Sequence, residues 1–165
     1  MNDYLEQYKK LHKQYKYGKS SEKLYNEILP LVKEINPKSI LDYGCGQSKL
    51  IDMLPCEQRY RYDPAVEEYS ILSTTNQVDL VICIDVLEHI PLEDLNETLV
   101  MIRHFSNNVI FDIGIKPATH ILPNGQNAHC TVKSIEWWIE YLKTFFPIIT
   151  FVKDIRGVKF LCKTW

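Results

Sequence analysis

Residues 39–46 read Ser-Ile-Leu-Asp-Tyr-Gly-Cys-Gly, a short apolar run that ends in two glycines one residue apart. The run predicts a buried strand over 39–43, and the polar-to-apolar residues 47–54 predict a helix after it. Strand, glycine turn and helix form half of a nucleotide-binding unit, because glycines let the backbone turn tightly beside a ligand. The stretch therefore predicts an α/β fold with a ligand site just after this strand.

Alternating strands and helices continue along the rest of the chain. Residues 80–84, Leu-Val-Ile-Cys-Ile, are continuously apolar, as is typical of a parallel strand buried on both faces. Apolar periodicity and turn residues predict the remaining elements, which are strands over 59–62, 109–115, 148–152 and 158–162 and helices over 4–15, 24–35, 91–102 and 134–146. This alternation predicts a three-layer α/β sandwich, with helices on both faces of a mostly parallel, twisted sheet of about six to seven strands.

The composition excludes several classes of protein. Apolar residues make up 45% and charged residues 24% of the chain, as in an ordinary folded domain. The cysteines lie far apart and form no C-x-x-C pair, so neither disulfides nor a metal site is predicted. The N-terminus lacks a signal-peptide pattern, and no apolar run approaches the ~20 residues that span a bilayer. We therefore expect a cytoplasmic protein that does not bind membranes.

The charge distribution bears on the choice of partner. A net charge of −2 does not provide the strong basic field of a dedicated nucleic-acid binder. Lysines nevertheless crowd near the N-terminus, at Lys9, Lys10, Lys13, Lys16, Lys19 and Lys23. Such a cluster is usually a solvated helix face. A small-molecule substrate is favoured, and a nucleic acid or another phosphate-bearing substrate stays open as the weaker alternative.

An acidic residue follows the second predicted strand. Asp63 lies 19 residues after Gly44, the spacing at which a carboxylate can accept hydrogen bonds from ribose hydroxyls. A fingerprint for nicotinamide dinucleotides would need a third glycine at position 49, where this chain has lysine. The pattern therefore favours a nucleoside-containing ligand other than a dinucleotide, and a nicotinamide oxidoreductase ranks last.

Three segments in this order, 40–46, 62–64 and 79–91, resemble the class I S-adenosylmethionine-dependent methyltransferases, and Asp-Val-Leu-Glu-His-Ile-Pro over 85–91 is the most specific part. The resemblance implies S-adenosylmethionine as cofactor and a seven-stranded sheet whose last strand is antiparallel. It also implies a role for each matching residue. The amino-acid end of the cofactor would bind Asp42, Gly44, Cys45 and Gly46, its ribose would bind Asp63 beside Pro64, and Asp85 with Val86 would surround its sulfonium and adenosine.

The sequence departs from the family pattern at two places. Ser48 stands where glycine is common, and only 15 residues, 65–79, separate the second strand region from the third. A full helix and strand do not fit there, so we expect this connection to be abbreviated. Recognition of adenine is left without an assigned residue, and the segment 15–18 is expected to cover the cofactor through Tyr17.

Two histidines are candidates for catalysis, and an asparagine and a tryptophan are candidates for substrate binding. Methyl transfer depends mainly on positioning, and a base helps when the acceptor is protonated. His89, just past a cofactor-facing strand, and His129, in a long loop, are the candidate bases. Asn127 and Trp137 are the candidate substrate contacts, whereas Trp138 shares an apolar helix face with Leu142 and is expected in the core.

The length of the chain fits one domain, because single cores serve roughly 100–200 residues. We expect four parts: an N-terminal helical cap over 1–36, a cofactor-binding core over 39–115, a substrate or lid loop over 116–133, and a helix with a terminal hairpin over 134–165. The loop is expected because structureless stretches of this length usually serve as lids or binding loops.

Methyl transfer to a small or polar acceptor is the leading hypothesis. Two alternatives bind the same cofactor: a non-catalytic S-adenosylmethionine-binding module, and an enzyme that cleaves S-adenosylmethionine without a methyl acceptor. The sequence identifies neither the acceptor nor the oligomeric state.

Overall fold

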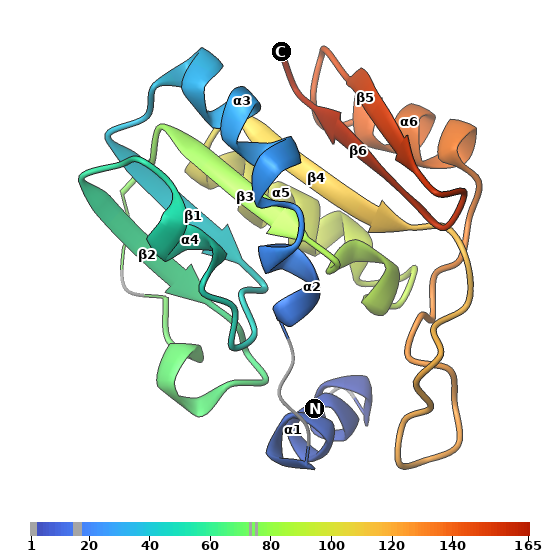
Figure 1. The fold of residues 1–165 in the computed structure, drawn as a ribbon. Coiled ribbons are helices and arrows are strands. Elements are labelled where there is room, and N and C mark those ends of the chain that lie inside the picture. The colour runs from blue at the N-terminus through green and yellow to red at the C-terminus, as the bar shows by residue number, and fades with distance from the viewer. Residues whose placement is uncertain (1–2, 15–17, 73, 75) are drawn as a thin grey trace.

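Six strands form one mixed sheet in the computed structural model, which describes residues 3–14, 18–72, 74 and 76–165 (Figure 1). The order across the sheet is β2-β1-β3-β4-β6-β5. The strands are β1 (Ser39–Tyr43), β2 (Gln58–Tyr62), β3 (Leu80–Ile84), β4 (Val109–Gly114), β5 (Thr150–Ile155) and β6 (Lys159–Lys163). β1 to β4 pair in parallel, and β6 runs antiparallel between β4 and β5. The mostly parallel sheet with an antiparallel last strand is therefore confirmed.

Helices cover both faces of this sheet. They are α1 (Asp3–Gln14), α2 (Lys19–Glu22), α3 (Tyr25–Ile35), α4 (Leu50–Met53), α5 (Leu95–Phe105) and α6 (Ile135–Lys143). Figure 1 shows α3 on one face of the sheet and α5 on the other, while α1 lies beyond the arrowheads of the parallel strands. None of the helices in the described part of the chain combines the length and apolar character needed to span a bilayer.

The helix predicted over 47–54 is shorter than expected. Its regular part, α4, covers only Leu50–Met53. The hydroxyl oxygen of Ser48 accepts a hydrogen bond from the backbone N–H of Leu50 at 3.0 Å. A serine that bonds the backbone two residues ahead favours a turn over a helix, so the first helical turn is replaced by a loop.

One core lies between α3 and the sheet. Ile28 and Val32 of α3 are fully buried against Ile40 of β1 and Ile82 of β3. Because side chains alternate between the two faces of a strand, the neighbouring residues Leu41 and Val81 point to the opposite face. The continuous apolar run of β3 is thus explained by burial on both sides.

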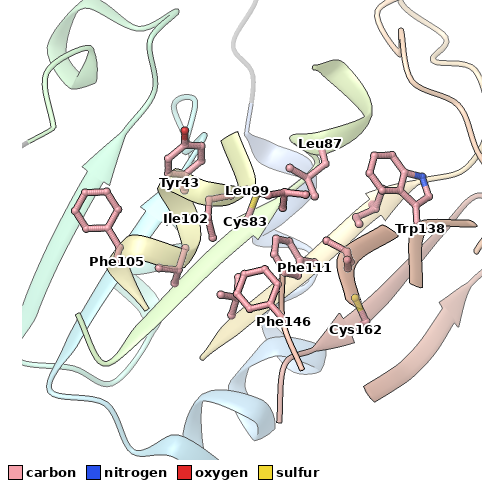
Figure 2. Packing of buried hydrophobic residues seen from close by; sticks show 14 of the residues in the cluster. Tyr43, Cys83, Leu87, Leu99, Ile102, Phe105, Phe111, Trp138, Phe146 and Cys162 are labelled. Carbon is pink, nitrogen blue, oxygen red and sulfur yellow. The ribbon is translucent and has the colours of Figure 1, made fainter. Parts of the chain in front are cut away.

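The second core lies beneath α5 and α6 (Figure 2). The largest side chains there are aromatic, and Phe111 of β4 meets Phe146 edge to face with ring centroids 5.7 Å apart. Trp138 of α6 is fully buried in this core, which confirms its expected place. Trp137 is only partly buried and stacks on Tyr141, with ring centroids 4.7 Å apart.

The connection between β2 and β3 is abbreviated, as expected. Within its described residues, the regular structure consists of one 3-10 turn, η1 (Glu67–Tyr69). No strand pairs with the outer edge of β2 in the described part of the chain, so β2 is an edge strand. The sheet therefore has six strands rather than the seven that the family resemblance implies.

The two adjacent tryptophans provide a test of this core. We expect Trp138→Ala to lower the free energy of unfolding by about 3–5 kcal/mol, because it leaves a large cavity in a packed core. Trp137→Ala serves as the matched control and should lower the free energy of unfolding by only about 1 kcal/mol, since a partly exposed side chain leaves no closed cavity. Urea unfolding followed by circular dichroism measures both. Equal losses would contradict the core assignment.

Candidate functional site

A cleft of about 1630 Å³ lies beyond the carboxyl ends of the parallel strands. Ligand pockets typically measure ~300–1,000 Å³, so the cleft has room for a cofactor together with a second molecule. Its walls come from α1, the start of α2, the strand ends and the loop that follows β4. The cleft therefore joins the two regions expected to cover the cofactor and to select the substrate.

Three carboxylates converge on this cleft. Asp42 lies in β1, Asp63 follows β2 and Asp85 follows β3, and all three line the cleft. Parallel pairing of β1 with both β2 and β3 brings these strand ends to one edge of the sheet. The three acids therefore lie at one cleft, and their roles in cofactor binding stay predictions. Cys45, Pro64 and Val86 line it as well, whereas Tyr17 lies outside the described residues.

Asp42 is a buried carboxyl group with a free oxygen. Its side chain is buried, and its Oδ2 has no hydrogen-bond partner among the residues that the structure describes. Burial raises the pKa of Asp42 to about 7; the charge of Arg61 opposes this shift, and the charges of Asp63 and Asp52 add to it. An unpaired buried carboxyl group costs stability unless a ligand supplies a donor. Asp42 is therefore suited to bind an ammonium or amine group.

The glycine turn packs closely against the end of β3. Gly44 has φ +76°, and a β-carbon there would lie 2.4 Å from a methyl group of Val86. The backbone N–H groups of Gly44 and Cys45 donate to the carbonyl of Tyr62 at 2.7 and 3.1 Å. Any side chain at position 44 would thus push the turn away from Val86.

Asp63 holds the same turn from the opposite side. Its Oδ2 accepts from the backbone N–H of Gly46 at 2.8 Å, and its Oδ1 accepts from that of Ala65 at 2.8 Å. Each carboxylate oxygen has two lone pairs, so both oxygens can accept a further hydrogen bond. The carboxylate is therefore fixed in place and still able to bind hydroxyl groups.

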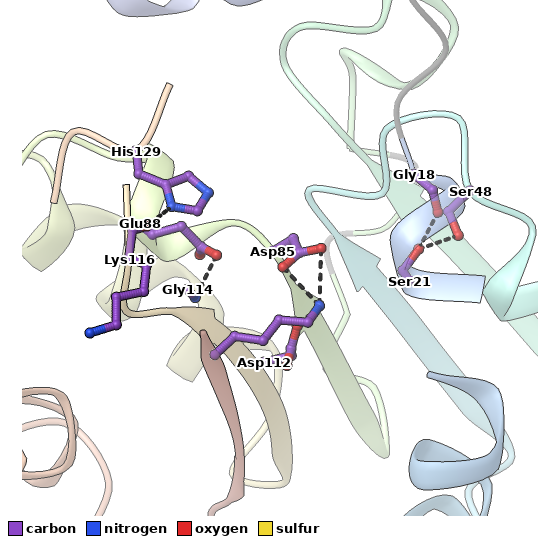
Figure 3. Close-up of polar contacts among 10 residues, drawn as sticks. Gly18, Ser21, Ser48, Asp85, Glu88, Asp112, Gly114, Lys116 and His129 are labelled. Carbon is purple, nitrogen blue, oxygen red and sulfur yellow. Dashed lines mark hydrogen bonds and ion pairs between the residues drawn. The ribbon is translucent and has the colours of Figure 1, made fainter. Parts of the chain in front are cut away.

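Ser48 attaches α2 to the glycine turn, which gives a physical reason for the departure from the usual glycine. The hydroxyl groups of Ser48 and Ser21 are hydrogen bonded at 2.7 Å, and both side chains are buried (Figure 3). Gly18, Ser20 and Ser21 line the cleft. The start of the second N-terminal helix thus forms part of the cleft wall.

An ion-pair network beneath Asp85 was missed by sequence reasoning. Lys159 of β6 places its Nζ 2.6 Å from Oδ2 of Asp112 and 3.1 Å from Oδ1 of Asp85 (Figure 3). Burial lowers the pKa of Lys159, but the charges of Asp112 and Asp85 outweigh it, so the pKa is raised overall. The lysine therefore stays charged and neutralises part of the acidic cleft.

His89 and His129, the two candidate bases, both line the cleft and lie in contact. Their ring centroids are 4.7 Å apart. Nδ1 of His129 lies 2.6 Å from the carbonyl oxygen of Lys116, and Nδ1 of His89 lies 3.0 Å from that of Ala128. Burial lowers the pKa of His89 to about 4, with a smaller contribution from His129, so its imidazole is neutral near pH 7.

The structure places the two candidate substrate contacts away from the cleft lining. Oδ1 of Asn127 accepts from the backbone N–H groups of Ala118 and His129, both at 2.9 Å, and its Nδ2 donates to the carbonyl of Ala118. Asn127 therefore shapes the loop. Trp137 packs on α6 beside Tyr141 instead of facing the cleft. Neither side chain contributes to the cleft surface, because loop closure and helix packing occupy them.

The glycine turn supports a matched pair of variants. Gly44→Ala and Gly125→Ala both place a β-carbon at positive φ, which costs ~1–2 kcal/mol. The added β-carbon of Gly125→Ala meets nothing within 4 Å, so that variant isolates the backbone strain. The free energy of unfolding of Gly44→Ala should fall by a further ~1–3 kcal/mol, because the added methyl group overpacks against Val86. Chemical unfolding compares the two, and equal losses would contradict the close packing of this turn.

Known proteins resemble this chain in structure but not in sequence. No protein-family model and no curated protein sequence matches the chain. Among solved structures, DhpI in complex with S-adenosylhomocysteine is similar over 96% of this chain and 94% of its own, with a TM-score of 0.63 and 14% identity. The methyltransferase domain of bacterial CtHen1 covers 88% of this chain, and 99% of that domain is matched, with a TM-score of 0.58 and 14% identity.

A third similar structure is the N-methyltransferase NodS from Bradyrhizobium japonicum in complex with S-adenosylhomocysteine. The match covers 86% of this chain and 84% of NodS, with a TM-score of 0.57 and 15% identity. Six strands in this order, a final antiparallel strand and helices on both faces agree with these structures. The chain has the fold of the class I S-adenosylmethionine-dependent methyltransferases.

Proposed function

We propose that this protein binds S-adenosylmethionine and transfers its methyl group to a small or polar acceptor. The observation that carries the proposal is the convergence of Asp42, Asp63, Asp85 and the glycine turn on one large cleft. This convergence occurs at the edge of a parallel sheet where ligands of such folds bind. The similarity to structures that hold S-adenosylhomocysteine supports the choice of cofactor.

The residues of the cleft fit the parts of this cofactor. The unpaired Oδ2 of Asp42 can accept a hydrogen bond from its ammonium group. The bend at Gly44 leaves the backbone open to its amino-acid end, and the fixed carboxylate of Asp63 can accept hydrogen bonds from its ribose hydroxyls. Asp85 and Val86 line the same cleft, and we assign them to the surroundings of the sulfonium and adenosine.

Adenine would find apolar surface on the abbreviated connection and on α5. Ile71 and Met101 line the cleft with 84% and 42% of their surfaces exposed, and Leu72 lies beside them in the lining. Exposed apolar side chains within a cleft are suited to cover a flat heterocycle. We therefore assign adenine contact to this wall, in place of the helix and strand that the chain lacks.

The bound cofactor supplies an electrophilic methyl group, so the protein mainly has to position the acceptor and exclude water. α1 and the loop after β4 close the side of the cleft away from the sheet, with Leu11, Leu122 and Ala128 buried together between them. Holding the acceptor in line with the methyl group supplies much of the rate in such reactions. The enclosure favours a small-molecule acceptor over a macromolecule.

Calorimetric titration tests the proposal directly. We expect S-adenosylmethionine and S-adenosylhomocysteine to bind the purified protein with one site each. Absence of binding up to about 1 mM, the upper end of usual substrate affinities, would overturn it. Incubation with a broad acceptor panel should then yield S-adenosylhomocysteine and a methylated product, identified by mass spectrometry. Binding without turnover would indicate a non-catalytic module, and turnover without a methylated product would indicate cleavage of the cofactor.

Asp42 should make cofactor binding depend on pH. Its pKa is raised to about 7 in the free protein, and a bound ammonium group would lower it again. Binding at pH 6 should therefore release a proton, and affinity should fall by up to tenfold per pH unit below 7. Arg61, Asp63 and Asp52 also face this group, so the profile reports their combined field.

Calorimetry in two buffers of different ionisation enthalpy measures the released proton. Asp42→Asn is the control, because the amide keeps the shape of the side chain and cannot titrate. It should bind more weakly at pH 7.5 and lose both the proton release and the slope below pH 7. A wild-type affinity that is the same at pH 6 and pH 7 would contradict the role of Asp42.

A further inference from the structure

His89 and His129 line the cleft, and Glu88 is buried beside them, so that three potential metal ligands lie together. One donor atom of each residue lies within 4.8 Å of the others, and the two imidazole rings meet nearly edge to face. Imidazole nitrogens with a carboxylate oxygen form a ligand set that suits divalent first-row transition metals. Sequence spacing did not reveal this set, because His129 comes from a loop 40 residues after His89.

Backbone carbonyls fix the tautomers of both histidines. The carbonyl of Lys116 can only accept a hydrogen bond, so Nδ1 of His129 carries the proton, and Figure 3 shows this contact. Nδ1 of His89 faces the carbonyl of Ala128 and the hydroxyl of Tyr8, and because that hydroxyl donates its proton to the same carbonyl, Nδ1 of His89 is assigned as a donor. Each ring therefore keeps its lone pair on Nε2. Histidines that ligate metals usually donate their other ring N–H to a carbonyl or carboxylate in this way.

Glu88 has an oxygen that the protein leaves without a partner. The side chain is fully buried, and its Oε1 accepts from the backbone N–H of Gly114 at 2.6 Å. Its Oε2 is buried and accepts no hydrogen bond from the described part of the chain. A purely structural carboxyl group at this place would cost stability through that orphan oxygen, whereas a cation would satisfy it.

The end of β4 is built to let these groups meet. A β-carbon on Gly114 would lie 2.6 Å from Oε1 of Glu88 and 2.7 Å from Cε1 of His129. Only glycine leaves space for both side chains there. The glycine at the end of β4 therefore lets the carboxylate of Glu88 and the imidazole of His129 approach each other.

We propose that Glu88, His89 and His129 bind a divalent first-row transition-metal ion at the wall of the cleft. Ligands on one such ion lie at most about 4.2 Å apart, twice a metal–nitrogen distance of about 2.1 Å. The three residues offer ligand atoms within 4.8 Å of one another, which is close to this limit. Three protein ligands leave at least one coordination position for water or substrate, as in catalytic metal sites.

The open coordination position on the ion indicates the chemistry of the methyl acceptor, and this inference about the acceptor rests on the proposed function. The proposed ion would lie in the same cleft as the cofactor. There it would bind a hydroxyl group of the acceptor and lower the pKa of that hydroxyl. The hydroxyl proton passes to solvent, and an oxygen lone pair forms the new bond to the methyl carbon. The carbon–sulfur bond breaks with its electron pair left on sulfur, which gives a methyl ether and S-adenosylhomocysteine. We therefore infer an oxygen acceptor.

Metal binding can be measured without any cofactor. Tag-free protein, stripped with a chelator, is titrated with Co²⁺ alone while the visible ligand-field bands and the heat of binding are recorded. We expect one saturable site whose bands indicate nitrogen and oxygen ligands, and Co²⁺ binding at least ~10-fold tighter than Mg²⁺ binding. No saturable Co²⁺ site at 1:1 stoichiometry, or tighter binding of Mg²⁺, would overturn the proposal.

Two variants and one control locate the site. His129→Ala and Glu88→Gln should each weaken Co²⁺ binding by more than ~10-fold, and Glu88→Gln keeps an acceptor for the Gly114 N–H if the alanine variant folds poorly. His104→Ala removes an exposed histidine outside the cluster and should bind Co²⁺ like the wild type. Circular dichroism verifies that each variant is folded. Wild-type affinity in both folded cluster variants would refute the assignment.

The acceptor inference has its own test. Turnover of paired alcohol and amine acceptors with the same carbon skeleton is compared before and after metal removal. Methylation of alcohols that stops on removal and returns with Co²⁺ supports an oxygen acceptor. Metal-independent methylation, or methylation of the amines alone, overturns this step while the titration still decides the metal site. Failure of the cofactor titrations would affect the proposed function and leave the Co²⁺ result standing.

Discussion

Parallel pairing of β1 with both β2 and β3 is the constraint on which the rest of the structure depends. Tyr43 pairs with Tyr62, and Asp42 pairs with Ile82 two residues before the end of β3. In the sheet, β2 lies on one side of β1, and β3 and β4 lie on its other side. The connections after β1 and β3 therefore run in opposite directions, and a crevice opens between them. Each residue that directly follows one of these strands is thereby directed to the same place.

Buried carboxyl oxygens near the ends of the parallel strands lower the stability of the fold. Among the described residues, Oδ2 of Asp42, Oε2 of Glu88 and Oδ1 of Asp112 are buried and have no hydrogen-bond partner. Such atoms cost about 1–3 kcal/mol each when nothing satisfies them. Asp42 and Asp112 lie near the carboxyl ends of β1 and β4, strands that are otherwise packed mainly with apolar side chains. Their concentration there is typical of a binding site, in which ligands complete the hydrogen bonds.

The N-terminal helix and the loop after β4 form one continuous cover. The hydroxyl of Tyr8 in α1 donates to the carbonyl of Ala128 and lies 2.8 Å from Nδ1 of His89. Leu11 of the same helix packs with Leu122 and Ala128 of the loop. A single hydroxyl thus connects the cover to the polar cluster at the strand ends. Access to the cleft and the arrangement of the histidines are therefore physically coupled.

The sequence by itself determined the strands, because their apolar runs are encoded locally. The strands over 39–43 and 80–84 were predicted with their observed bounds. Asp63 was predicted from its spacing to Gly44, whereas the family resemblance implied Asp42 and Asp85. The short α4 was overestimated, because a serine hydrogen bond to the backbone replaced a helical turn. Asn127 and Trp137 were placed at the substrate because residue type alone does not show what a side chain packs against.

Only the tertiary structure decided which distant groups meet. Lys159 reaches Asp112 because antiparallel β6 pairs with β4 in the register that sets Gly114 opposite Lys159. Glu88 and His129 come together because Gly114 has no side chain between them. Such contacts depend on strand register and on the volume left by neighbouring residues. Local periodicity carries no information on either, since both arise when separate elements pack.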